Sequence, residues 1–182
     1  MQGVTMIRST TILTVRRDNQ VAIGGDGQVT LGSVAVKHSA KKIRKVYNDC
    51  VLLGFAGSAS DGMTLYEKLE QKLERYRGNL QLAAVELARD WRSDRILRRA
   101  EALMIAVDAK GAYLLSGMGD VISPDDDMLA IGSGGSIALS AARALLKYSQ
   151  LTAKEVVEEA LKITSDICIY TNDSIVVDSI EI

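Results

Sequence analysis

The sequence predicts an α+β protein in which two stacked, mostly antiparallel sheets lie between two layers of paired helices. The order of expected elements is strands, two helices, strands, two helices and a last strand, which differs from the strand–helix alternation of a parallel sheet. The segment DCVLLGFAG at residues 49–57 is almost continuously apolar, which indicates a strand buried on both faces. Together these observations favour a four-layer αββα sandwich.

The composition fits a single domain of this kind. The chain has 182 residues, 47% hydrophobic and 25% charged, which is enough for one substantial core and too short for two domains. A formal net charge of −1 argues against binding nucleic acid through a broad basic face. The sequence has no apolar run of membrane-spanning length and no apolar secretory segment near its start, so we expect a cytoplasmic protein.

In the N-terminal half, β-branched and apolar residues predict strands at 10–15, 21–23, 29–31 and 49–57. Gly24–Gly27 form a turn. A helix is expected to begin near Ser58 and to end at Gly78–Asn79, because leucines recur every fourth residue at 65, 69 and 73. A second helix is expected from about Leu80 to Arg98, with small and apolar residues on one stripe.

In the C-terminal half, apolar runs predict strands at 102–108, 112–117, near 120–122, at 128–132 and at 174–182. Ala109–Gly111 joins the first two of these strands. A helix is expected from about Ser136. Thr152 and Glu155 have the S/T-x-x-E spacing of a capping box, which begins a last helix that continues to about Ile167.

Several residues of reactive types have an ordinary structural interpretation. His38 is the only histidine, and no G-x-S-x-G motif accompanies it, so we interpret it as a polar residue outside any catalytic triad. Cys50 and Cys168 form no CxxC pattern, which suggests a reducing compartment, and both are expected to be buried, unreactive thiols. Asp125–Asp127 lack EF-hand spacing and are interpreted as a solvated turn.

The glycine-rich segment GSGG, Gly132–Gly135, lies between an expected strand and an expected helix. Three uses are open at this point. It can form a tight strand-to-helix turn, it can bind a phosphate with backbone N–H groups at the helix N-terminus, or the same groups can stabilise an oxyanion. The segment matches neither the Walker A nor the dinucleotide-binding pattern, so no nucleotide site is predicted.

Thr10 and Thr11 stand at the start of the first expected strand, behind nine residues with no evident structural role. A Thr hydroxyl needs an adjacent base to act as a nucleophile. If Thr10 were the first residue of the mature chain, its own α-amino group, with a pKa of about 7.7, would be such a base. The segments GDG and AKKIRK offer a carboxylate and cations to support it. An ordinary pair of strand residues is the simpler local interpretation.

A longer set of motifs favours the catalytic interpretation. These are TTILTVRR, GGDGQVTLG, KKIRKVYND, GFAGSASDGMTLYEKLEQKLE, AAVELARDWRSDRILRR, EALMIAVD, AIGSGG and DICIYTN. Together they resemble the HslV (ClpQ) family, the threonine peptidase subunits of a bacterial two-component, ATP-dependent protease related to the proteasome β subunits. The resemblance extends from Thr10 to near the C-terminus. It implies the N-terminal-nucleophile hydrolase fold, an αββα sandwich, which agrees with the expected element order.

The resemblance also implies roles for individual residues. Thr10 matches the N-terminal catalytic threonine, Lys42 the lysine beside it, and Asp26 the acidic residue that orients the lysine. Ser133 of GSGG matches the active-site serine, with the backbone nearby expected to receive the oxyanion. Residues 1–9 are then a leader removed on maturation, and residues 10–182 form a single peptidase domain.

The same family binds a structural sodium ion through backbone oxygens. The matching positions here are Ser165, Cys168 and Thr171. Relatives usually have glycine at the first of these positions, so Ser165 departs from the pattern. A carbonyl ligand survives the change if the backbone torsions suit a residue with a Cβ.

The resemblance further implies an assembly and a partner. We expect a homo-oligomer of two stacked hexameric rings, with sites facing an inner chamber in which unfolded protein is degraded. The HslU AAA+ ATPase ring is the expected partner, and the absence of a Walker A motif in this sequence agrees with nucleotide chemistry belonging elsewhere. Two alternatives are another N-terminal-nucleophile hydrolase acting on small amides, and a non-catalytic subunit of a proteasome-like particle.

Overall fold

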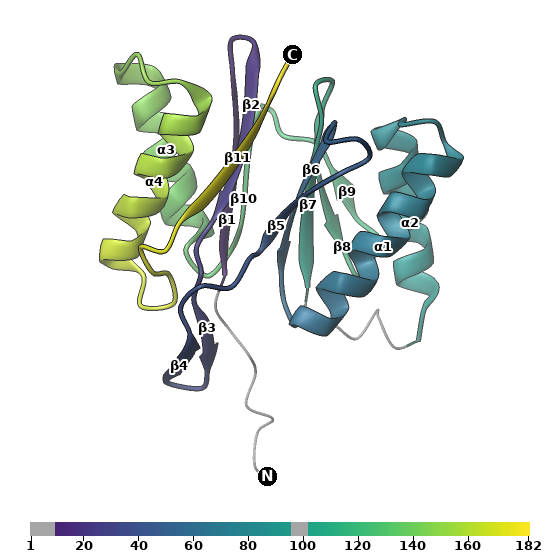
Figure 1. Cartoon of the computed structure of the whole chain (residues 1–182), viewed down its shortest axis with the longest axis horizontal. Coiled ribbons are helices and arrows are strands. Elements are labelled where there is room, and N and C mark those ends of the chain that lie inside the picture. Colours follow the sequence, from purple (N-terminus) through teal and green to yellow (C-terminus); the bar gives the residue numbers. More distant parts are fainter. Residues whose placement is uncertain (1–9, 96–101) are drawn as a thin grey trace.

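The computed structural model of this chain describes residues 10–95 and 102–182, except for the side chains of 59 and 60. Two sheets face each other, and a pair of helices covers the outer face of each sheet (Figure 1). On one side lie α1 (Ala59–Arg75) and α2 (Leu80–Ser93), and on the other lie α3 (Gly135–Tyr148) and α4 (Ala153–Ile167). The predicted four-layer αββα sandwich is confirmed.

Both sheets are antiparallel throughout the described pairings. The first has the order β10 (Met128–Gly132), β1 (Thr11–Arg17), β2 (Gln20–Gly25) and β11 (Val176–Glu181). The second has the order β5 (Ile43–Val46), β6 (Val51–Ala56), β7 (Leu103–Val107), β8 (Ala112–Ser116) and β9 (Val121–Ile122). A separate hairpin of β3 (Val29–Leu31) and β4 (Val34–Lys37) projects from the body of the molecule (Figure 1).

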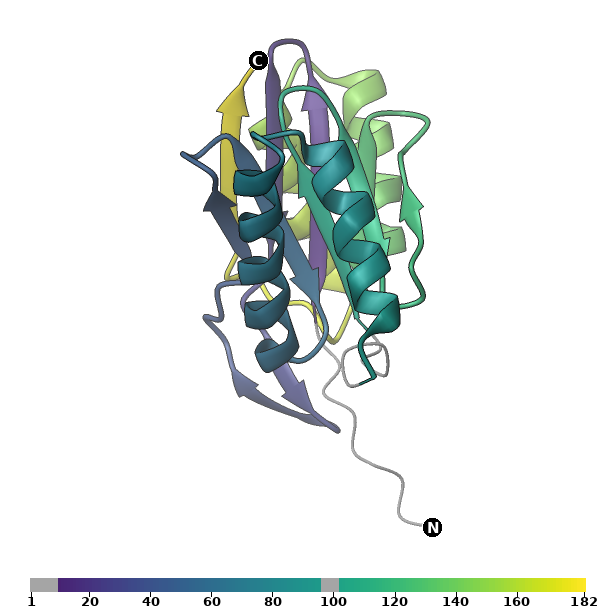
Figure 2. The same ribbon diagram turned by 90° about the vertical axis from the view of Figure 1, so that its right-hand side faces the viewer.

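Apolar side chains fill all three interfaces between the layers. Ile12, Ile23 and Ile105 are fully buried between the sheets. Trp91 of α2 is fully buried beneath the α1–α2 layer, whose helices lie side by side over their sheet (Figure 2). A Cβ on Gly54 would lie 2.5 Å from Cγ2 of Ile12, so this glycine allows β1 and β6 to approach closely. Burial on both faces explains the continuous apolar run of β6.

The helix boundaries follow local signals. Ser58 caps α1 by accepting from the N–H of Asp61, and Asn79 caps α2 by accepting from the N–H of Leu82. Thr152 and Glu155 form both hydrogen bonds of the expected capping box at α4. Sequence-based prediction was therefore accurate where a capping side chain precedes a periodic apolar stripe.

Other expectations need correction. The helix α2 ends at Ser93 instead of near Arg98, because Asp94 adopts an extended backbone; residues 96–98 of the expected helix lie outside the described residues. The strands β4 and β5 were not predicted, and all four residues of β4 are exposed, so it lacks the alternation that marks a half-buried strand. Cys50 is exposed in the turn before β6, not buried in the strand, while Cys168 is buried as expected.

None of the helices in the described part of the chain combines the length and the apolar character needed to cross a membrane.

Candidate active site

Thr10 lies directly before β1 and is largely buried, with 7% of its surface exposed. Its carbonyl oxygen accepts a 2.9 Å hydrogen bond from the N–H of Ser133. The neighbouring Gly132 has φ +90°, and a Cβ there would overlap the same carbonyl oxygen. Only glycine meets both demands, so the GSGG segment holds the backbone of Thr10 by close contact.

Lys42 and Asp26 form a buried ion pair beside Thr10. The Lys42 Nζ lies 2.8 Å from Asp26 Oδ1, and the two side chains are 8% and 0% exposed. Burial lowers the pKa of the Lys42 ammonium below its ordinary value, and the charge and hydrogen bond of Asp26 oppose that shift. The positive charge of Lys42 is therefore stabilised by the carboxylate of Asp26.

Backbone N–H groups from three positions orient the Asp26 carboxylate. Oδ1 accepts from Thr11 N at 2.8 Å, and Oδ2 accepts from Gln28 N at 2.9 Å and from Asn172 N at 3.4 Å. These donors, together with Lys42, hydrogen-bond both carboxylate oxygens and leave the group little freedom to rotate. The Asp26 carboxylate is thus held in a defined orientation toward the ammonium of Lys42.

Thr11 takes part in a different set of contacts. Its Oγ1 lies 2.7 Å from Oγ1 of Thr171 and accepts a 3.1 Å hydrogen bond from the N–H of Gly134. The residue is fully buried. Its hydroxyl therefore ties β1 to the start of α3 and to the segment after α4, and Thr10 alone of the pair lines the adjoining pocket.

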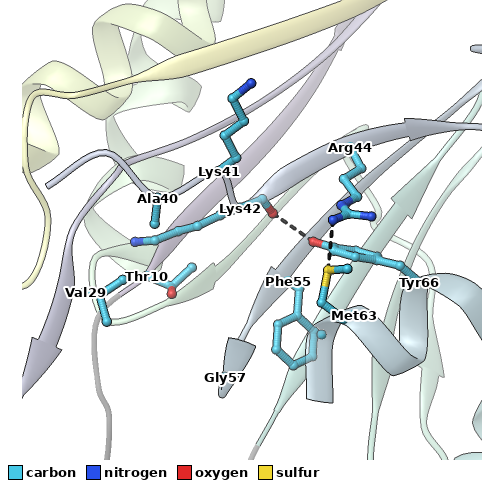
Figure 3. Close-up of a pocket in the computed structure, with 11 residues that line it drawn as sticks. Thr10, Val29, Ala40, Lys41, Lys42, Arg44, Phe55, Gly57, Met63 and Tyr66 are labelled. Carbon is cyan, nitrogen blue, oxygen red and sulfur yellow. Dashed lines mark hydrogen bonds between the residues drawn. The ribbon is translucent and has the colours of Figure 1, made fainter. Parts of the chain in front are cut away.

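That pocket has a volume of about 180 Å³. Thr10 and the amino end of Lys42 lie at one end of it, and a cluster of larger side chains lies at the other (Figure 3). The lining residues are Thr10, Val29, Ala40, Lys41, Lys42, Arg44, Phe55, Gly57, Gly62, Met63 and Tyr66. Three of them are cations, and none of the described lining residues is acidic.

Contacts among the large residues give the far end of the pocket a defined shape. Tyr66 Oη donates to the carbonyl oxygen of Lys42 at 2.9 Å, and burial raises the pKa of this phenol, so the hydroxyl keeps its proton. The Arg44 guanidinium lies 5.3 Å from the centre of the Tyr66 ring and donates to Met63 Sδ at 2.8 Å (Figure 3). The result is an apolar wall with a cation at its edge.

Of the residues singled out by the resemblance, Thr10 and Lys42 line one pocket and Asp26 pairs with Lys42. Ser133 reaches Thr10 through its backbone N–H, while its exposed side chain is not among the pocket residues. The N–H groups of Ser133 and Gly134 donate to Thr10 and Thr11, so neither is directed at the pocket. Gly57, at the end of β6, does line it and was not predicted from the sequence.

The three expected sodium ligands lie at or just beyond the C-terminal end of α4. Ser165 is within the helix, Cys168 is its C-cap, and the N–H of Thr171 donates to the Cys168 carbonyl at 2.9 Å. The last turn of a helix leaves carbonyl groups without intrahelical partners, and α4 has no basic residue in that turn. Ser165 lies within the helix, where a residue with a Cβ is accommodated without strain, so the serine in place of glycine does not disturb the backbone.

Residues with an ordinary interpretation remain outside the site. The side chain of His38 is exposed, and Asp125–Asp127 form an exposed turn in which Asp126 pairs with Arg143 at 2.7 Å. Within residues 10–95 and 102–182 no group of three or more His, Cys, Asp and Glu side chains is arranged to hold a metal ion.

Comparison with known proteins shows a consistent relationship. Residues 6–180 match the family model described as proteasome subunit. The chain is 59% identical to the ATP-dependent protease subunit HslV of Aquifex aeolicus over 174 residues, which is 96% of this chain and 99% of the relative. It is 55% identical to HslV of Syntrophobacter fumaroxidans over 170 residues, covering 93% and 95% of the two chains.

Solved structures agree with this relationship. HslV from Trypanosoma brucei superposes with a TM-score of 0.89 at 44% identity, covering 94% of this chain and 99% of that one. A Thiobacillus denitrificans protein named BPH, solved in complex with epoxomicin, superposes with a TM-score of 0.71 at 18% identity, covering 94% and 98%. The second similarity concerns the fold alone.

The contacts of Thr11 predict a structural role that can be measured. Thr11→Val should lower the free energy of unfolding by roughly 1–3 kcal/mol, because it leaves the Gly134 N–H and the Thr171 hydroxyl without a buried partner. Thr14→Val is the matched control, since the Thr14 hydroxyl donates a 2.8 Å hydrogen bond to Ala22 O. This substitution should cost about 1 kcal/mol. Urea unfolding measures both, and an equal loss in the two variants would contradict the assignment.

Proposed function

Since the chain belongs to the proteasome family and is a peptidase subunit of the HslV type, we propose that Thr10 is its catalytic nucleophile. The observation that carries the proposal is the position of Thr10, which lines a pocket together with Lys42, the cation of the buried Lys42–Asp26 ion pair. A threonine peptidase of this design requires residues 1–9 to be removed, because a peptide nitrogen is not a base. Those residues lie outside the described structure, so the leader and the mature domain 10–182 are part of the proposal.

In the proposed reaction, Thr10 Oγ attacks the carbonyl carbon of the scissile peptide bond, and the α-amino group of Thr10 accepts the hydroxyl proton. The tetrahedral intermediate collapses, the C–N bond breaks, and the amine returns the proton to the leaving nitrogen. Water then attacks the resulting ester, with the same amine as base, and releases the second product. Base and nucleophile belong to one residue, so they are positioned before substrate binds.

Lys42 has an electrostatic role in this scheme. Its positive charge beside the amine of a processed Thr10 would disfavour a second positive charge on that amine. Asp26 holds the ammonium at 2.8 Å and is itself held by backbone N–H groups. Burial alone would favour the neutral amine of Lys42, and the ion pair with Asp26 opposes this and keeps the amine positively charged.

For the oxyanion we propose the backbone at Gly57 in place of the GSGG segment. Gly57 lines the pocket that holds Thr10, whereas the Ser133 and Gly134 N–H groups donate to Thr10 and Thr11. The role of Ser133 and its neighbours is then to fix the backbone of the nucleophile. A preorganised N–H at the developing oxyanion is typically worth a hundredfold or more in rate.

We further propose the assembly implied by the family. The relatives are named ATP-dependent protease subunits, and this chain resembles them over nearly its whole length. We therefore expect an HslU ring as partner and a cytoplasmic homo-oligomer of two hexameric rings that admits unfolded chains. A sodium ion held by backbone oxygens of Ser165, Cys168 and Thr171 would neutralise the carbonyl groups at the end of α4 and stiffen the segment that carries Thr171.

The first test concerns the nucleophile. Thr10→Ala should abolish peptide hydrolysis and, if processing is autocatalytic, leave residues 1–9 attached, which intact-mass measurement detects. Thr11→Ala should retain at least partial activity, because its nitrogen stays in a peptide bond. Active particles whose N-terminal residue is not Thr10 would show that the mechanism is assigned to the wrong residue.

The second test concerns Lys42. Lys42→Ala should assemble normally and lose roughly a hundredfold or more in kcat, because the Thr10 amine loses its neighbouring cation. Lys45→Ala, three residues further along in β5, is the control: Lys45 pairs with Asp178 at 3.7 Å, outside the pocket, and its loss should leave turnover unchanged. Normal turnover of Lys42→Ala would remove this residue from the mechanism.

The third test concerns the pocket. Peptides that place Tyr or Leu before the cleaved bond should be hydrolysed at least about tenfold faster, in kcat/KM, than the same peptide with Lys, because like charges in a desolvated pocket repel. Arg44→Leu should reduce the difference in kcat/KM between the Tyr or Leu peptides and the Lys peptide. Equal rates for the Tyr and Lys peptides would show that the pocket of Phe55, Met63 and Tyr66 does not receive that side chain.

A further inference from the structure

We propose that Asn172 is a positioning residue for the Asp26–Lys42 pair, because its side chain joins the two chain segments that carry these groups. The inference rests on the proposed function, since it concerns how the charged pair of that function is held. Asn172 follows α4 and Thr171, and it is far from both segments in sequence.

Both polar atoms of the Asn172 side-chain amide form hydrogen bonds. Its Oδ1 accepts a 3.0 Å hydrogen bond from the N–H of Gly27, and its Nδ2 donates a 2.9 Å hydrogen bond to the carbonyl oxygen of His38. Gly27 follows Asp26 directly, and His38 begins the short segment that leads to Lys42. One planar group thus spans the two segments.

The two segments are also packed against each other at this point. A Cβ on Gly27 would overlap the carbonyl oxygen of His38, and the N–H of Ala40 donates to Gly27 O at 2.9 Å. The backbone N–H of Asn172 reaches Asp26 Oδ2 at 3.4 Å. Segments 26–28, 38–42 and 171–172 therefore meet at one point, and Asn172 forms hydrogen bonds to both of the other segments.

The consequence for the site is a fixed separation of the charges. Lys42 lies two residues beyond Ala40, so a shift of the 38–42 segment moves the base of the lysine side chain relative to Asp26. The 2.8 Å contact between the ammonium and the carboxylate depends on that separation, and burial lowers the pKa of a lysine that loses its partner. Misplacement by about 1 Å can cost up to roughly a hundredfold in rate.

An asparagine suits this position chemically. The contact needs one acceptor for the Gly27 N–H and one donor for the His38 carbonyl on a single rigid group. Aspartate offers no donor, and serine is too short to reach both partners. Asn172 is not among the described residues that line the pocket, so its loss should affect the catalytic step more than substrate binding.

The experiment compares Asn172→Ala, Thr10→Ala and the unsubstituted chain as assembled particles with their ATPase partner, using one fluorogenic peptide. Asn172→Ala should lower kcat by about tenfold to a hundredfold with little change in KM. Asn79→Ala is the matched control: it removes a helix-capping asparagine whose Oδ1 accepts from Leu82 N, so it should lower Tm and leave kcat unchanged. If Asn172→Ala fails to assemble, Asn172→Ser, which is uncharged and too short to span both partners, replaces it.

The outcomes separate the two proposals. A reduced kcat at unchanged KM, beyond any effect of Asn79→Ala, supports the positioning role. An unchanged kcat in Asn172→Ala or Asn172→Ser overturns it, as does a loss confined to KM, which would place Asn172 in substrate binding. An active Thr10→Ala particle would instead overturn the proposed function, independently of Asn172.

Discussion

The buried carboxylate of Asp26 is the group on which the arrangement of the site depends. It accepts hydrogen bonds from the backbone of Thr11, Gln28 and Asn172 and from the ammonium of Lys42. Each donor comes from a different stretch of chain, so the carboxylate joins the first strand, the turn after β2, the segment before β5 and the segment after α4. A buried charge is tolerated only when it is paired in this way, and breaking such a pair is costly.

The sandwich explains why these segments meet. The two sheets are stacked, so the start of β1 and the end of β6 lie near the same edge of the molecule (Figure 1). The glycine at 54 allows the close approach of β1 and β6, and the glycine at 132 allows the loop after β10 to contact the Thr10 carbonyl. Thr10 is consequently held directly before β1 by contacts from the loop after β10, which favours a fixed backbone geometry at the proposed nucleophile.

Thr10 and Thr11 have different surroundings because of the geometry of the strand that they begin. Successive side chains of a strand point to opposite faces, so Thr10 and Thr11 meet different surroundings. Thr10 lines the cationic, partly apolar pocket, and Thr11 bonds to Thr171 and Gly134 on the α3–α4 side. Two identical side chains thus lie in separate surroundings, one at the pocket and one in a buried set of hydrogen bonds.

The layered fold could be predicted from the sequence, because long apolar runs, helical stripes and capping residues such as Thr152 are local signals that the structure retains. Motif resemblance also singled out Thr10, Asp26 and Lys42. The tertiary structure alone decided that Cys50 is exposed, that the Ser133 and Gly134 N–H groups are already used, and that Gly57, Tyr66 and Asn172 belong to the site or its support. Their roles depend on hydrogen bonds and contacts between segments distant in sequence, and no local pattern encodes which segments meet.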